Sequence, residues 1–152
     1  MFELKYMELI VITLIFLFLF GSINLAAPSK KTKLISKLRL DAMKIGFKIS
    51  SLKISTLEFR SRDYSNMVYQ FKNKTNLKDA HFIRDKGELI LYSPLKLKYS
   101  EAYDGLEMTL NNLPHEVVEI IFTPSSISFL WNEKGGLAIL NKVSETTNSI
   151  EL

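Results

Sequence analysis

The feature of this chain that most constrains its fold is an apolar run from Leu9 to Ala27, LIVITLIFLFLFGSINLAA, which contains no charged side chain. Its length is close to the about 20 residues that a helix needs to cross the hydrocarbon core of a bilayer. A cleavable secretory signal is the alternative interpretation, but the run exceeds a usual h-region and lacks a well-placed cleavage site before Pro28. The sequence therefore predicts a retained, single-pass transmembrane helix within residues 1–29.

A carboxylate, Glu8, directly precedes the apolar run. An acidic side chain moved to the bilayer centre costs about 2.5–3.5 kcal/mol, and less near the interface. Glu8 therefore either stays among the lipid headgroups or meets a cationic partner. In the first case the positive end of the helix dipole would stabilise it by about 0.3–1 kcal/mol. The residues alone leave both interpretations open.

After Pro28 the pattern becomes amphipathic, because apolar residues recur at intervals of three and four, the spacing of one helical face. This face, which we expect to pack on the rest of the protein, comprises Ile35, Leu38, Ala42, Ile45, Ile49 and Leu52. We predict an amphipathic half-helix over residues 30–61. Since helices in membranes tolerate proline, we expect it to continue the transmembrane helix through a kink at Pro28.

Residues 62–152 alternate between apolar and polar side chains with period two, and turn residues separate the alternating segments. Short loops between strands favour antiparallel hairpins. The predicted strands are 67–71, 88–92, 95–99, 106–110, 117–122, 127–131 and 136–140. The predicted fold class is thus α+β, a long N-terminal transmembrane-plus-amphipathic helix packed on a C-terminal antiparallel β-sheet domain. We expect Phe122, Phe129 and Trp131 in its core, and a surface docking patch is the alternative for these residues.

This organisation resembles the type IV pilin-like family, most closely the H-type minor pseudopilins of type II secretion systems and related minor pilins. Glu8 followed by LIVITLIFLFLF corresponds to the glutamate and apolar helix of that family, and Pro28 to its proline. Residues 36–71 resemble the second half-helix running into the first strand. The segment EIIFTPSSISFLW (119–131) resembles a strand that ends in Phe-x-Pro.

The resemblance implies a structural subunit of a secretion pseudopilus or pilus, with other pilin-like subunits as partners through the N-terminal helix. Glu8 would then pair with the N-terminal ammonium of a neighbouring subunit and fix the axial register. Leader removal, methylation of the new terminus, and an inner-membrane location with the C-terminal domain in the periplasm are also implied. The alternative is a membrane-anchored envelope protein whose β domain binds a partner without filament assembly.

Charge patterning bears on the topology and on nucleic-acid binding. Basic residues dominate from Lys30 to Lys53, where Asp41 is the single acid. Taken alone, the positive-inside rule would place the domain in the cytoplasm, whereas the resemblance implies the periplasm, which we adopt. The net charge is +4, but the C-terminal SETTNSIEL is acidic and polar, which does not favour DNA binding.

Three acids and two histidines are the remaining candidate site residues. Glu101, Asp104 and Glu107 surround a predicted turn and could form a cation-binding loop, although the loop lacks the alternating ligands of an EF-hand. We expect His81 and His115 to be ordinary surface residues in loops. The chain has no cysteine, and no phosphate-binding loop or catalytic constellation is recognisable. We therefore expect no enzymatic activity, no metal, no cofactor and no small-molecule substrate.

Overall fold

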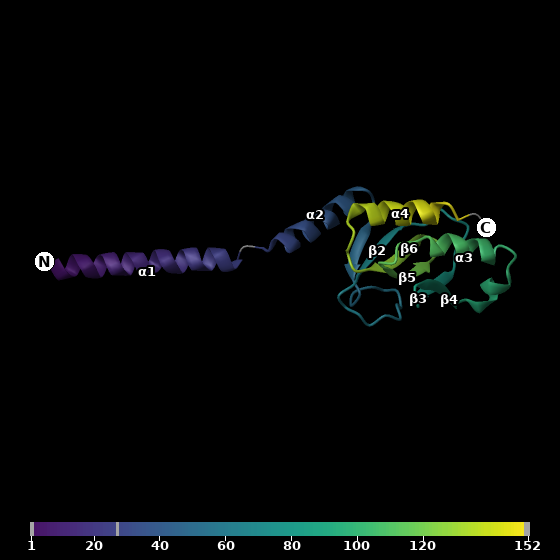
Figure 1. Ribbon diagram of the computed structural model, residues 1–152, viewed down its shortest axis with the longest axis horizontal. Coiled ribbons are helices and arrows are strands. Elements are labelled where there is room, and N and C mark those ends of the chain that lie inside the picture. Colours follow the sequence, from purple (N-terminus) through teal and green to yellow (C-terminus); the bar gives the residue numbers. More distant parts are fainter. Residues whose placement is uncertain (1, 27, 151–152) are drawn as a thin grey trace. The chain divides into compact units, whose positions relative to one another are not determined.

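The computed structural model describes residues 2–26 and 28–150, and the chain divides into two compact units, residues 1–34 and 35–152. The first unit contains helix α1 (Phe2–Ala26), drawn in purple in Figure 1, and the beginning of helix α2 (Lys30–Lys44). Ser29 caps the start of α2, because its Oγ accepts a hydrogen bond from the Thr32 amide (3.2 Å) and its carbonyl accepts one from the Lys33 amide (3.0 Å). The predicted continuous helix with a kink at Pro28 is therefore wrong: α1 ends before Pro28 and a newly capped helix begins after it.

The predicted half-helix over residues 30–61 is also wrong beyond Lys44. Gly46 has a φ of 100°, a left-handed conformation that suits glycine. The Gly46 amide donates to the Met43 carbonyl and the Phe47 amide to the Ala42 carbonyl, both at 3.1 Å. This pair of hydrogen bonds is the Schellman motif, which ends a helix. The chain then enters strand β1 (Lys48–Ser51).

The six residues predicted to form one packing face consequently separate. Ala42 is fully buried and Leu38 packs against the same main core. Ile49 reaches this core from β1, whereas Leu52 packs in a second, smaller cluster. Ile35 is half-buried, and Ile45 is 55% exposed. Only the middle of the predicted face therefore packs on the domain as a helix.

The second unit is built on a six-stranded antiparallel sheet with the order β1-β2-β6-β5-β3-β4. The α+β class and the antiparallel sheet agree with the prediction. The strands after β1 are β2 (Met67–Lys72), β3 (Ala80–Asp85), β4 (Glu88–Ser93), β5 (Val117–Phe122) and β6 (Ser126–Trp131).

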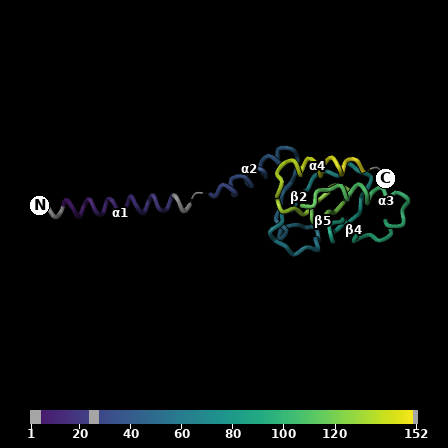
Figure 2. Tube along the Cα trace, viewed as in Figure 1, coloured from purple at the N-terminus to yellow at the C-terminus, as the bar shows by residue number. Residues whose placement is uncertain are grey.

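Helices α3 (Tyr103–Asn111) and α4 (Leu137–Asn148) contribute to the main core together with one face of this sheet. That face supplies the large buried side chains Tyr69, Phe82, Phe122, Phe129 and Trp131. The last three confirm the predicted core. Figure 2 shows α4 running along one side of β2 and β5, with the loop that joins β1 to β2 on the other side.

Three predicted strands are not strands. Residues 95–99 form a 3-10 helix, η1 (Leu95–Tyr99), residues 106–110 lie in α3, and residues 136–140 enter α4. Leu106 and Leu110 are both buried, a spacing of four that fits a helical face as well as an alternating strand. In α4 the buried residues Leu140, Val143 and Thr147 follow the helical spacing. Strands β1 and β3 were not predicted.

A half-buried ionic contact joins Arg39 of α2 to the loop between β6 and α4. Arg39 donates from Nε and Nη2 to the two carboxylate oxygens of Glu133 at 2.7 and 2.8 Å. The hydroxyl of Tyr69 donates to the same carboxylate at 2.9 Å. Burial, reinforced by the neighbouring Glu133, raises the pKa of Tyr69, so this hydroxyl remains a donor. The contact holds the part of α2 that belongs to the second unit.

Candidate functional site: a basic groove over the second face of the sheet

The face of the sheet that points away from α3 and α4 carries a groove of about 770 Å³. We call it the basic groove. Its wall is the loop of residues 52–66, which has no helix or strand. Irregular loops of this length are uncommon in compact domains and usually have a function. The basic and aromatic residues that line it include Lys53, Arg60, Arg62, Tyr64, His81 and Tyr92.

A histidine and a carboxylate lie under this loop. Glu119, on β5, is completely buried, and Nε2 of His81, on β3, lies 2.5 Å from its Oε1. The loop completes the arrangement, since the Arg60 amide donates to Oε1 at 2.7 Å and the Ser61 amide to Oε2 at 3.0 Å. The buried carboxylate thus connects two strands to the loop. The adjacent side chain of Phe59, also buried, packs with Val68 and Leu130 and adds an apolar contact.

The hydrogen bonds decide the ionisation of Glu119. Burial alone raises the pKa of a carboxyl group, but the donors His81, Arg60 and Ser61 outweigh burial, so the pKa of Glu119 is lowered. The carboxylate form is therefore the one that the fold binds. Hydrogen bonds to a charged group are stronger than those between neutral groups, which makes Glu119 the main polar attachment of the loop.

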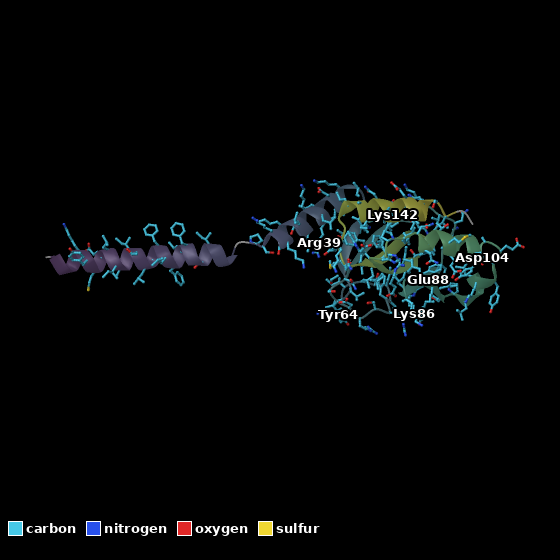
Figure 3. The ribbon with its side chains drawn as sticks, viewed as in Figure 1. Arg39, Tyr64, Lys86, Glu88, Asp104 and Lys142 are labelled. Atoms are coloured by element: carbon cyan, nitrogen blue, oxygen red, sulfur yellow. The ribbon has the colours of Figure 1, made fainter. Side chains whose placement is uncertain are left out.

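The aromatic and cationic side chains of the groove contact one another. The Tyr92 ring meets the His81 ring edge-on, with centroids 5.0 Å apart, and the Arg60 guanidinium carbon lies 5.2 Å from the centroid of Tyr92. Nζ of Lys53 lies 5.4 Å from the centroid of the Tyr64 ring. Both tyrosines remain about half exposed. Figure 3 labels Tyr64 on the side of the domain away from Lys142 of α4.

Within the described residues, Lys53, Arg60 and Arg62 make no ion pair, although all three are exposed at the groove. Glu58 is the one acid among the residues that line it, while Glu119 beneath is bound by the loop amides and by His81. The groove thus combines an excess of positive charge with exposed aromatic surface. Such a surface can bind anions through charge-assisted hydrogen bonds. Among the described residues, Nε2 of His81 hydrogen-bonds to Glu119, and no Ser, Thr or Tyr hydroxyl is hydrogen-bonded to His81.

The first unit carries the other candidate, Glu8. The segment Lys5–Ile23 of α1 has a mean hydropathy of 2.3, and none of it is buried, so α1 is long and apolar enough to cross a membrane. Glu8 lies near the start of this helix and Pro28 lies beyond its end.

The predicted cation loop takes another form. Asp104 and Glu107 belong to α3, and Glu101 lies in the turn before it. The hydroxyl of Tyr103 donates to Glu107 at 3.3 Å. In residues 2–26 and 28–150 no group of three or more His, Cys, Asp or Glu side chains is placed to hold a metal ion. Glu101 thus lies before α3, Asp104 in its first turn and Glu107 further along the helix.

The two histidines, both expected at the surface, differ in their burial. His115 is exposed as predicted, but the prediction is wrong for His81, which is buried in β3 against Glu119. Glu119 was not singled out from the sequence at all. The sequence does contain a sign that Glu119 is unusual, because it is a carboxylate among apolar residues in the middle of the correctly predicted strand 117–122. A buried carboxylate requires a partner, but the sequence does not indicate that the partner is His81.

Comparison of the chain with protein-family models, with curated proteins and with solved structures found no match.

Proposed function

We propose that this chain is a single-pass membrane protein that acts as a structural subunit, associating laterally with similar subunits through α1 in the manner of pilins and pseudopilins. The observation that carries this proposal is that no residue of the segment Lys5–Ile23 is buried. A helix that is apolar on all sides requires apolar surroundings on all sides, such as lipid or other helices. The α+β layout of the second unit is compatible with such a subunit.

The energetics favour insertion despite Glu8. Leucine, isoleucine, phenylalanine and valine side chains each favour the bilayer centre by about 0.3–0.6 kcal/mol. The many such residues between Leu9 and Ile23 together supply on the order of 5 kcal/mol. This exceeds the about 2.5–3.5 kcal/mol needed to bring an acid to the centre, so Glu8 does not prevent insertion.

Lateral assembly gives Glu8 a specific role. A carboxylate in a low-dielectric bundle costs several kcal/mol unless a cation compensates it, and an ionic contact of this kind sets register between chains. In the proposed assembly the cation is the N-terminal ammonium of a neighbouring subunit. A secretion pseudopilus in the inner membrane, with the second unit in the periplasm, is the setting that this role and the family resemblance favour.

The test compares Glu8→Ala with Glu101→Ala, which removes an exposed carboxylate from the second unit. We expect both variants to reach the membrane fraction in equal amounts. Glu8→Ala should be lost from isolated filaments or pseudopili, while Glu101→Ala should be retained. Normal incorporation of Glu8→Ala would remove the assembly role. The intact mass of the membrane-extracted chain would show in addition whether a leader is removed and the new terminus is methylated.

The basic groove favours a second candidate, a membrane-anchored envelope protein whose domain binds a partner without filament assembly. This candidate predicts that Glu8→Ala does not affect binding of the partner, whereas substitutions in the groove abolish it. Glu8→Ala, compared with a change in the groove, therefore separates the two candidates.

A further inference from the structure

We propose that the basic groove is a binding site for a small, multiply charged anion that carries phosphate or carboxylate groups, and that Arg60 and Arg62 are its principal ligands. The site belongs to the second unit, so the proposal is independent of how α1 assembles.

The size of the groove fits such a ligand. Binding sites for small molecules usually have volumes of about 300–1,000 Å³ and contain a few well-placed polar groups. The basic groove has about 770 Å³. A multiply charged anion also matches the charge of the lining, where Lys53, Arg60 and Arg62 oppose Glu58.

The two arginines supply the recognition. A guanidinium presents planar, paired donors that match the oxygens of phosphate and carboxylate, and Lys53 adds a point charge on the same loop. Within the described residues no carboxylate occupies these three cations. They are exposed, so an anion from solution can reach them.

The loop that carries the arginines is held in place before any ligand binds. Glu119 accepts the amides of Arg60 and Ser61, and Phe59 is buried beside them. The Arg60 guanidinium also lies over Tyr92, which His81 supports from the sheet. A site fixed in this way loses less conformational entropy on binding. Glu119 and His81 are therefore positioning residues, because they act through the loop.

The groove offers two exposed aromatic surfaces to a ligand that contains a ring. Tyr64 and Tyr92 are 56% and 45% exposed and line the same groove. Aromatic side chains next to cations are suited to ligands that combine a ring with charged groups. The chemical class is thus an anion such as a phosphorylated or carboxylated ring compound, whether free or as a lipid headgroup.

The experiment is isothermal titration calorimetry of the full chain in nonionic detergent, with inorganic pyrophosphate and citrate as probes. We expect saturable binding that weakens as the salt concentration rises. Arg60→Ala and Arg62→Ala should each lower the affinity about tenfold or more, since each removes charge-assisted hydrogen bonds. The control is Lys142→Ala, which removes one positive charge from α4 on the other side of the domain.

A second arm identifies the source of the anion. Phosphatidylglycerol added to the micelles, compared with phosphatidylcholine, should displace pyrophosphate if the natural ligand is a lipid headgroup, and should leave it bound if the ligand is a free anion. Absence of saturable binding of both probes at millimolar concentrations would overturn the proposal. So would an equal loss of affinity in Lys142→Ala, because that would reveal only unspecific attraction to a basic protein. Trp131 is fully buried, so its fluorescence verifies that each variant is folded. Lys53→Ala provides a further variant of the groove.

Discussion

Replacement of Glu119 by alanine should be among the most destabilising single changes in the second unit. The substitution leaves three donors without their acceptor, namely the amides of Arg60 and Ser61 and the Nε2 atom of His81. Each buried donor left unpaired costs about 1–3 kcal/mol, and removal of one member of a buried pair costs about 3–5 kcal/mol. Water from the adjacent groove can reach the two amides, so we expect a loss of about 3 kcal/mol, at the lower end of that range.

Glu119→Gln separates the charge from the shape of the side chain. The glutamine carbonyl can still accept one loop amide, but its amide group cannot accept the other. We therefore expect about half of the loss seen with alanine. In a double-mutant cycle, His81→Ala should cost at least about 0.5 kcal/mol less in the Glu119→Ala background than in the unmodified protein, because the two residues share one contact.

The assay is urea unfolding of the full chain in nonionic detergent, followed by the fluorescence of Trp131. This residue is the one tryptophan of the chain and is fully buried in the main core, so its emission reports the unfolding of the second unit. Glu101→Ala, which removes an exposed carboxylate, is the control. A free energy of unfolding for Glu119→Ala within about 0.5 kcal/mol of the unmodified protein would refute the reasoning, since surface substitutions have effects of that size.

Three further predictions use the same assay. Folding lowers the pKa of Glu119, so its contribution to stability is present above its ordinary pKa of 4.5 and is lost as the pH falls through the lower pKa of the folded state. The free energy of unfolding should therefore decrease below pH 4.5, and it should decrease less in the Glu119→Gln variant. Gly135→Ala should destabilise by about 1–3 kcal/mol, because φ is 86° and the new Cβ would lie 2.5 Å from Cγ1 of Ile139. Gly105→Ala, in the first turn of α3 where an added Cβ meets nothing within 4 Å, should instead stabilise by about 0.5–1 kcal/mol. The reverse order would contradict the loop geometry. Arg39→Lys should cost about 1 kcal/mol, because a lysine cannot reproduce the paired hydrogen bonds to Glu133, and an unchanged midpoint would show that this contact is not stabilising.

The sequence predicted those elements whose pattern has one interpretation. The run from Leu9 lies in α1, and the alternating segments 67–71, 88–92, 117–122 and 127–131 lie in strands. The prediction was wrong where one pattern fits two structures. Ile49 and Leu52 continue the helical spacing of Leu38 and Ala42, although Gly46 had already ended the helix through its positive φ.

The basic groove could not be predicted, because it depends on tertiary contacts between segments far apart in the chain. Arg60 and Glu119 are separated by 59 positions, and His81 lies between them in a strand that was not predicted. The sequence shows that Glu119 is a carboxylate in an apolar strand. The structure shows that its partners include the Arg60 and Ser61 amides, which hold the irregular loop of residues 52–66 in place as the wall of the groove.

The central proposal, that α1 is retained in the membrane and contacts similar helices, is tested most directly by disulfide cross-linking in intact membranes. The chain has no cysteine, so single cysteines can be introduced one at a time from Leu9 to Ile23 without a background. We predict cross-linked dimers whose yield peaks every three to four positions, as expected for one helical face in contact, with no cross-linking from Lys142→Cys on α4. Recovery of the chain in the soluble fraction, or a membrane-bound chain that forms no cross-link at any of these positions, would contradict the proposal.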